Sequence, residues 1–234
     1  MKRLFYLSVL LFLALRLGAA EPIRVACVGN SITYGHGIAN RETAAYPAVL
    51  GRLLGSGYEV RNFGISARTL LQKGDHPYMS EPIYREALDF EPDIVTIKLG
   101  TNDTKPFNWV YQDEFKDDLR TLIGSFQALD SHPQIYLCTP IPGGREDWGI
   151  NDSTLVASVI PYIREVADEL SLEVVDLHTA FAPYQHLLYD RVHPNADGAA
   201  VIAHVIAEAL LKEGAPAPNR KCKLWGKRKH KKNL

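Results

Sequence analysis

Residues 24–35, Arg-Val-Ala-Cys-Val-Gly-Asn-Ser-Ile-Thr-Tyr-Gly, are the stretch that indicates the fold class of this chain. Residues 23–28 form an apolar, β-branched run, which is typical of a strand buried inside a sheet. Gly29, Asn30 and Ser31 follow at once and predict a turn, so Ser31 lies just beyond the carboxyl end of the strand. Ligands of open parallel sheets bind at this edge. Ser31 is therefore a candidate functional residue, although the same three residues also suit an ordinary turn.

Strands and helices alternate along the rest of the 234-residue chain, which is long enough for one α/β domain. Further strands are predicted at residues 58–62, 94–99, 134–139 and 173–177. A polar loop is predicted at residues 33–43, and helices at residues 44–54, 83–89, 114–129, 151–170 and from about 196 to 212. This order requires a five-stranded parallel sheet with helices on both faces. The carboxyl ends of its strands then gather at one edge.

The first twenty residues differ from the rest in composition. Lys2 and Arg3 precede an apolar run at residues 4–17, and small residues lead up to Ala20. This pattern predicts a secretory signal peptide, residues 1–20, and the apolar run is short for a membrane span. An uncleaved anchor is the alternative. We expect a secreted or periplasmic protein whose mature form has no membrane span.

The formal net charge of −1 hides an asymmetry along the chain. Eight basic residues and no acidic one lie within residues 220–232, so the mature body is acidic, with a charge of about −12. An acidic body has no basic face for nucleic acid. We predict a catalytic domain at residues 21–214, followed by a linker and a solvated basic tail at residues 215–234. Such a tail also suits an anionic surface or polymer.

The three cysteines, Cys27, Cys138 and Cys222, show no metal-binding spacing. Their odd number argues against a disulfide framework in an exported protein. We expect Cys27 and Cys138 to be buried thiols within strands.

Other predicted strand ends carry the side chains that a nucleophilic serine needs, namely a base, a group that orients the base, and donors for the oxyanion. His193 is the candidate base. Asp190, three residues earlier, can accept its Nδ1 proton and fix the tautomer. Candidate oxyanion donors are the Ser31 backbone N–H, Gly64 and the Asn102 amide, although Gly64 also suits a positive φ and Asn102 a helix cap. The rival bases are His36, His76 and His178.

These positions resemble the motifs of the SGNH, or GDSL-type, hydrolase family. Four motifs occur in the family's order between residues 29 and 194, at residues 29–31 (Gly-Asn-Ser), 62–64 (Asn-Phe-Gly), 100–103 (Gly-Thr-Asn-Asp) and 190–194 (Asp-Arg-Val-His-Pro). One departure is Asn30, where the family usually has Asp. That position is not one of the catalytic groups, so the departure leaves the mechanism standing and affects local hydrogen bonding.

The resemblance implies a flavodoxin-like, three-layer α/β/α fold and ester hydrolysis through an acyl-serine intermediate. In it Ser31 would be the nucleophile, with His193 as base and Asp190 orienting it, and with Ser31, Gly64 and Asn102 forming the oxyanion hole. No metal or organic cofactor is needed. An α/β-hydrolase fold is disfavoured because its Gly-x-Ser-x-Gly elbow is absent.

The class of ester is less sharply indicated. Trp109 and Trp148 lie among polar residues in the predicted loops, a mixture that suits a sugar, or else they cover the core. The motifs also resemble the carbohydrate-esterase branch of the family, which includes acetylxylan and sialate O-acetylesterases. We therefore expect a glycan O-deacetylase.

Three other functions were weighed against the deacetylase. A lysophospholipase or thioesterase would need an apolar acyl channel, and a glycan-binding module without activity would have no use for the triad. A nucleotide-binding domain is disfavoured because neither Gly-x-Gly-x-x-Gly nor a P-loop follows the first strand.

Overall fold

The structure is a computed structural model and describes residues 21–212. It contains one five-stranded, all-parallel sheet in the order β2-β1-β3-β4-β5, which confirms the predicted fold class. The strands are β1 (Ile23–Gly29), β2 (Tyr58–Gly64), β3 (Ile94–Lys98), β4 (Gln134–Cys138) and β5 (Glu173–Val175). The chain reverses its direction across the sheet between β1 and β3. Such a switch point opens a crevice at the carboxyl ends of the two strands.

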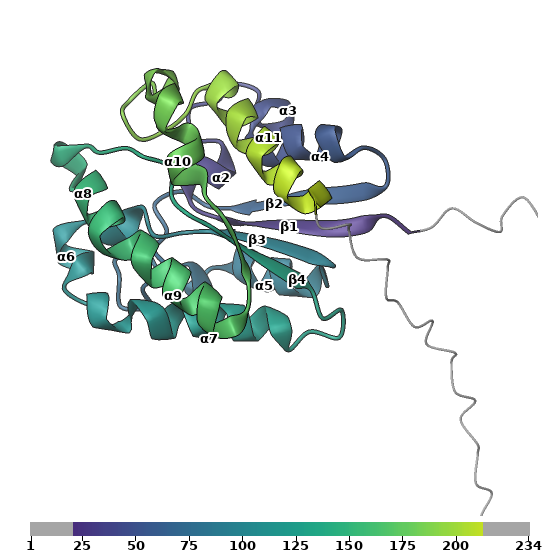
Figure 1. Cartoon of the computed structure of the whole chain (residues 1–234), viewed down its shortest axis with the longest axis horizontal. Coiled ribbons are helices and arrows are strands. Elements are labelled where there is room, and N and C mark those ends of the chain that lie inside the picture. The colour runs from purple at the N-terminus through teal and green to yellow at the C-terminus, as the bar shows by residue number, and fades with distance from the viewer. Residues whose placement is uncertain (1–20, 213–234) are drawn as a thin grey trace, which may run out of the picture.

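Helices cover both faces of the sheet and give the three layers seen in Figure 1. One face packs against α5 (Pro82–Asp89), α7 (Phe115–Gln127) and α9 (Ile160–Leu170). The other packs against α4 (Tyr46–Leu54), α10 (Leu177–Phe181) and α11 (Ala196–Lys212). Burial on both sides explains why β3 is buried throughout and lacks a polar alternation.

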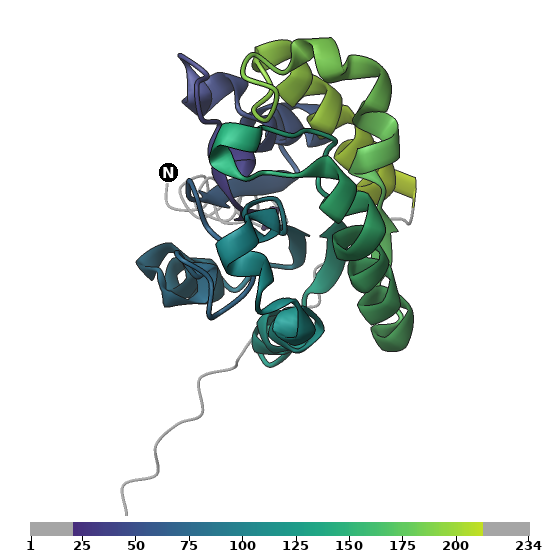
Figure 2. The same ribbon diagram turned by 90° about the vertical axis from the view of Figure 1, so that its left-hand side faces the viewer.

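Short helices lie in the connections, and Figure 2 faces the edge of the sheet at which the strands end. The shorter elements are α2 (Ser31–Tyr34), α3 (Arg41–Ala44), η1 (Tyr78–Ser80), η2 (Asn102–Thr104), α6 (Pro106–Trp109), η3 (Gln112–Glu114), η4 (Glu146–Trp148), α8 (Asp152–Thr154), η5 (Leu155–Val159) and η6 (Ala182–Leu187).

Two predictions of secondary structure were wrong in detail. The predicted loop at residues 33–43 holds the end of α2 and the first three residues of α3. The fifth strand ends at Val175 instead of residue 177, because the Asp176 carboxylate accepts the Thr179 N–H at 3.1 Å and thereby caps α10. The apolar pattern at the end of this segment suits either a strand or a helix, and the side-chain cap decides in favour of the helix.

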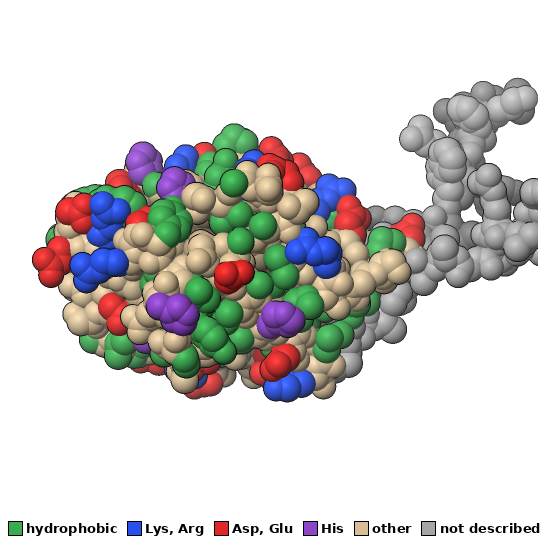
Figure 3. Space-filling model, turned by 90° about the horizontal axis from the view of Figure 1, so that it is seen from above, with side chains coloured by type: hydrophobic (Ala, Val, Ile, Leu, Met, Phe, Trp, Pro, Cys, Tyr) green, Lys and Arg blue, Asp and Glu red, His purple; other side chains and the backbone are tan. Residues whose placement is uncertain are grey.

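The predicted signal peptide, the basic tail and Cys222 lie outside the described residues. Between residues 21 and 212, no helix is long and apolar enough to cross a membrane. Cys27 and Cys138 are buried free thiols, as predicted. On the side of the molecule that carries α4 and α11, acidic and basic side chains are interspersed (Figure 3).

Lys98, the last residue of the central strand, is fully buried on the face that packs against α4 and α11. Its Nζ has no hydrogen-bond partner among the residues that the structure describes. Burial lowers the pKa of Lys98 to about 7, because a charged ammonium loses its hydration there. Lys98 therefore lowers the stability of the folded state at any pH at which it must be protonated.

We expect Lys98→Met to raise the free energy of unfolding at pH 7 by about 1 kcal/mol or more, a shift of about 2–4 °C in Tm for a domain of this size. Between the folded pKa near 7 and the higher pKa of the unfolded chain, the unfolded state binds more protons. The free energy of unfolding of the wild-type protein should therefore rise relative to that of the variant as pH rises from 7 to 10. Denaturant melts at several pH values, with the exposed Lys212→Met as control, measure both effects. Equal stability at pH 7 and parallel pH slopes would contradict this prediction.

Candidate active site

Ser31 is placed by a tight turn from β1 into the one-turn helix α2. The Asn30 side-chain oxygen accepts a hydrogen bond from the Ile32 N–H at 3.1 Å and caps this helix. Asn and Asp are both favoured at the N-cap of a helix, so Asn30 can fill the same capping role as the family's usual Asp. Gly29 has no room for a side chain, since a Cβ there would lie 2.1 Å from Thr33 Oγ1 and 2.8 Å from the Lys98 carbonyl oxygen. The turn presents Ser31 as the first residue of α2, beside the switch point of the sheet.

Ser31, His193 and Asp190 form one chain of hydrogen bonds. His193 Nε2 lies 2.7 Å from Ser31 Oγ, across 162 sequence positions, and His193 Nδ1 lies 2.7 Å from Asp190 Oδ2. Asp190 Oδ1 accepts the N–H groups of Val192 at 3.0 Å and His193 at 2.7 Å, which locks the turn. The structure thus brings together the three residues that the sequence indicated.

None of the rival histidine rings is hydrogen-bonded to Ser31 in the part of the chain that the structure describes, although the His36 backbone N–H donates to the Ser31 carbonyl at 2.9 Å. The His36 ring packs 4.7 Å from the His193 ring, centroid to centroid. The His178 ring bonds to Asp152 at 3.3 Å instead, and for His76 the structure gives a backbone contact with Thr69. His193 is therefore the histidine that the geometry pairs with the serine.

Burial and hydrogen bonding set the charges of this chain. Burial lowers the pKa of His193, and the adjacent Asp190 offsets part of that shift. Burial alone would raise the pKa of Asp190, but hydrogen bonds from the His193 ring and from the N–H groups of His193 and Val192 outweigh it and lower that pKa. At neutral pH a neutral imidazole then faces a carboxylate. The carboxylate holds the ring proton on Nδ1, so Nε2 is free to accept the Ser31 proton.

Two of the three expected oxyanion donors keep an N–H that the hydrogen bonds described here leave unused. Asn102, buried at the start of η2, uses its amide Nδ2 to donate to the Arg68 carbonyl at 3.0 Å, and this amide carries a second proton. Ser31 is the first residue of α2, where the N–H has no partner within the helix.

The third expected donor is Gly64, at the end of β2. Its N–H donates to Asn62 Oδ1 at 2.9 Å, so this donor already has a partner. A Cβ at Gly64 would lie 2.3 Å from the Tyr34 backbone nitrogen. The glycine is needed because the end of β2 packs directly against α2.

The two candidate tryptophans occupy different places. Trp148 is 36% exposed, and its ring lies 5.8 Å from the His193 ring. Trp109 instead packs against Phe115 and Tyr162, at 5.8 and 6.3 Å between ring centroids. Trp109 thus matches the alternative interpretation, in which the ring covers the core.

Sequence reasoning missed Tyr189 beside the site and named His36 only as a rival base. The Tyr189 ring stacks on His193 at 6.1 Å and is 51% exposed, and His36 contacts the other histidine as described above. Tyr189 directly precedes Asp190, a proximity that could have drawn attention to it. Nothing in the sequence near His36 distinguishes it from the other histidines.

No cluster of side chains that could hold a metal ion occurs within residues 21–212. The chemistry of the site is that of a serine, an imidazole, a carboxylate and hydrogen-bond donors.

Known proteins share both the sequence and the fold. The chain is 45% identical over 208 residues to an acetylxylan esterase of Xylanibacter ruminicola, covering 81% of this chain and 43% of that protein. It is 29% identical over 113 residues to a multidomain esterase of Ruminococcus flavefaciens, covering 47% of this chain and 14% of that protein. The chain thus spans less than half the length of these curated relatives.

Solved structures with low sequence identity share the fold. A carbohydrate acetylesterase from Sinorhizobium meliloti superposes with a TM-score of 0.68 at 19% identity, over 81% of this chain and 99% of that one. An aryl esterase from M. smegmatis superposes with a TM-score of 0.63 at 18% identity, over 82% and 98%. The model of the GDSL-like lipase/acylhydrolase family matches residues 27–201, from β1 into α11. The chain is a member of the GDSL-like lipase/acylhydrolase family.

Proposed function

We propose that this protein is a serine esterase that removes O-acetyl groups from carbohydrates of the acetylxylan or sialate type. The observation that carries the proposal is the hydrogen-bonded chain from Ser31 through His193 to Asp190 at the carboxyl edge of the sheet. Family membership and the 45% identity to an acetylxylan esterase support the reaction class and favour xylan. A module that only binds glycans would have no use for this arrangement.

The mechanism follows from the charges of the site. His193 Nε2 takes the Ser31 proton as Oγ attacks the acyl carbon, and Asp190 stabilises the imidazolium that forms. The imidazolium then gives its proton to the sugar oxygen as the ester bond breaks, which leaves an acetyl-serine. His193 next takes a proton from water, and the resulting hydroxide attacks the acetyl group. Acetate and the free serine are released as the proton returns to Oγ.

The negative charge on the acyl oxygen needs donors that are already in place. In our proposal these are the Ser31 N–H and the second amide proton of Asn102. Gly64 is left out because its N–H is bonded to Asn62.

The surroundings of the triad favour a sugar over a long acyl chain. Trp148 offers an exposed ring beside His193, of the kind that stacks on the apolar face of a sugar. The cavity that adjoins the triad loop is lined largely by polar side chains and glycines. A lysophospholipase or thioesterase would require an apolar channel there. We further propose export, from the signal-peptide pattern of residues 1–20.

Replacing the nucleophile tests the reaction class. We expect Ser31→Ala to lower hydrolysis of p-nitrophenyl acetate by about three to six orders of magnitude, because the acyl-enzyme cannot form. Ser125→Ala, on α7, is the matched control and should keep wild-type activity. Assays with p-nitrophenyl acetate, butyrate and octanoate measure both rate and acyl preference. Undiminished activity in Ser31→Ala would exclude the mechanism, and a preference for octanoate would favour the lipid-ester alternative.

Because His193 is buried, we expect the enzyme to keep its activity at mildly acidic pH. Since the pKa of His193 lies below its ordinary value of 6.5, the neutral base persists below that pH, and the acid limb of kcat/KM should have its midpoint below 6.5. NMR titration of the His193 ring protons should likewise give a pKa below 6.5. In Asp190→Asn the midpoint should fall further, because the carboxylate that stabilises the imidazolium is gone. A wild-type midpoint above 6.5, or a rise in Asp190→Asn, would contradict this assignment.

Removal of the side-chain donor tests the oxyanion hole. We expect Asn102→Ala to lower kcat by about 10²–10³-fold with little change in KM. Asn108→Ala is the control, because Asn108 Nδ2 donates to the Asn102 carbonyl at 3.0 Å and its loss disturbs the same loop without removing the Asn102 amide. Steady-state kinetics on p-nitrophenyl acetate, with thermal melts of both variants, separate the two roles. Equal losses of kcat would assign Asn102 to loop structure alone.

A further inference from the structure

A polar cavity of about 650 Å³ adjoins the triad without including any of its three residues. Its size falls in the range of small-molecule sites. Its wall is formed by segments that are far apart in the sequence, and it includes Glu146, Asp152, Gln185 and Arg191. The mechanism above gives this cavity no role.

The loop at residues 143–150 separates the cavity from the triad. Arg145 and Ile150 exchange two backbone hydrogen bonds, at 2.8 and 3.1 Å, which close the loop into a ring. The Gly144 N–H donates to the Arg191 carbonyl at 3.1 Å and ties the loop to the turn that holds Asp190 and His193. Trp148 contacts His193, whereas Gly144, Glu146 and Gly149 of the same loop line the cavity. A ligand in the cavity thus lies against the loop that also walls the triad.

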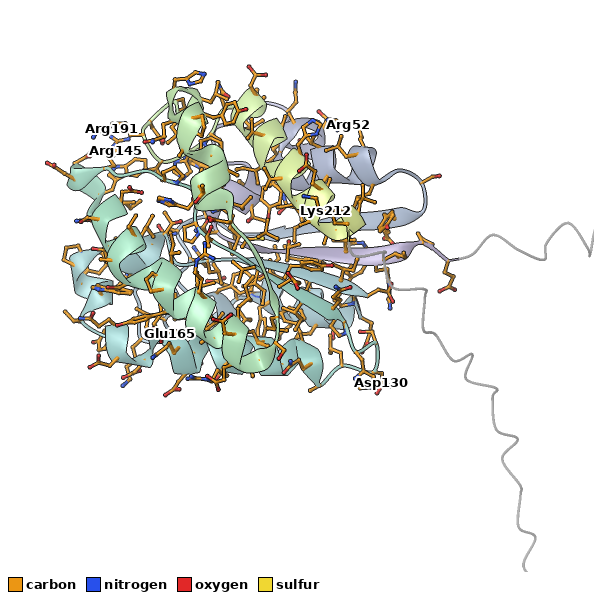
Figure 4. The ribbon with its side chains drawn as sticks, viewed as in Figure 1. Arg52, Asp130, Arg145, Glu165, Arg191 and Lys212 are labelled. Carbon is orange, nitrogen blue, oxygen red and sulfur yellow. The ribbon has the colours of Figure 1, made fainter. Side chains whose placement is uncertain are left out.

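Arg191 is the most unusual residue of this cavity. Its backbone has φ of 71°, a left-handed conformation that glycine or asparagine adopts at lower cost. Its guanidinium is exposed and has no hydrogen bond or ion pair among the residues that the structure describes. Arg145, at the same end of the molecule in Figure 4, differs, because it bonds to Asp147 at 2.9 Å and lies 3.9 Å over the Trp148 ring. The hydrogen bond from Arg145 lowers the pKa of the Asp147 carboxyl, and the charge of Arg191 lowers it further, so Arg191 lies near Asp147. Its guanidinium nevertheless has no hydrogen-bond partner in the described chain and can donate to a ligand.

The charges around the cavity favour a neutral ligand with many hydroxyls. The Glu146 carboxylate is exposed and, within residues 21–212, has no side-chain partner either. Asp152 Oδ1 accepts the Gly143 N–H at 3.0 Å and adds a second negative charge to the wall. An anion would meet these carboxylates and a cation would meet Arg191, whereas hydroxyl groups can accept from the guanidinium and donate to the carboxylate.

We propose that this cavity binds a sugar residue of the glycan chain that adjoins the esterified one, with Arg191 donating to its hydroxyls and Glu146 accepting from them. The inference rests on the proposed glycan esterase activity and adds the site that recognises the chain. It implies that the enzyme distinguishes an acetylated oligosaccharide from a small acetate ester through contacts outside the triad.

Binding is tested first, without catalysis. We expect xylotetraose to bind to the Ser31→Ala protein, as measured by isothermal titration calorimetry, and Arg191→Asn added to that protein to weaken binding by about tenfold, since hydrogen bonds to a charged group are strong. Asn tolerates the left-handed backbone, so the triad turn is kept. Arg191→Gly is a second variant with the same expectation. Arg85→Gln, an exposed arginine on α5, is the control and should bind as the parent does.

Kinetics supply an independent readout. Arg191→Asn should lower kcat/KM for acetylated xylotetraose at least about tenfold more than it lowers kcat/KM for p-nitrophenyl acetate, because only the oligosaccharide reaches the cavity. Gly144→Leu should act in the same direction. A Cβ at Gly144 has no neighbour closer than 3.5 Å, so a larger side chain fits there and narrows the cavity.

The outcomes separate this inference from the proposed function. Absence of xylotetraose binding, or equal losses on both substrates in Arg191→Asn, would overturn the cavity as a glycan site. The proposed function fails separately, if wild-type protein shows no Ser31-dependent hydrolysis of p-nitrophenyl acetate. In that case the binding measurement still decides whether the cavity holds a sugar.

Discussion

The hydrogen bonds of the His193 imidazole are the interaction on which the functional part of this fold depends. One ring must accept from Ser31 at 2.7 Å and donate to Asp190 at 2.7 Å, and it must do so while buried and neutral. Burial favours the neutral ring, and the carboxylate selects the tautomer. The parallel sheet makes this possible because β1 and the turn before α11 both end at the same edge.

Local hydrogen bonds orient each of these side chains within its own turn, and the fold brings the turns together. Asn30 caps α2 and so fixes the direction of Ser31, and Asp190 accepts two N–H groups of its own turn and so fixes itself beside His193. Each motif satisfies buried polar groups that would otherwise be costly. The sheet beneath them is an exception, because it buries the Nζ of Lys98 with no hydrogen-bond partner among the described residues.

The surface beside His193 is organised around the loop at residues 143–150, which has two sides. Trp148 borders the His193 ring, and Gly144 and Glu146 border the neighbouring cavity. The two nearby arginines also differ in their contacts. Arg145 is bound to Asp147 and stacks on Trp148, which stiffens the loop, whereas the Arg191 guanidinium, whose charge also acts on Asp147, has no hydrogen bond in the described chain. If the cavity binds a sugar as proposed, the proximity of the two sites would couple the position of the glycan chain to the position of the ester.

The sequence by itself determined the parallel α/β fold and indicated Ser31, Asp190 and His193, the three hydrogen-bonded residues of the candidate site. Alternating strands and helices permit few topologies, and the Asp190–His193 spacing acts within a single turn, so both follow from local pattern. The tertiary structure alone decided which partners distant residues meet. It gave the Gly64 N–H to Asn62, packed the partly buried Trp109 against the core but left Trp148 at the site, and opened a cavity beside Arg191. Those outcomes depend on how separate crossovers pack against one another, and no local pattern carries that information.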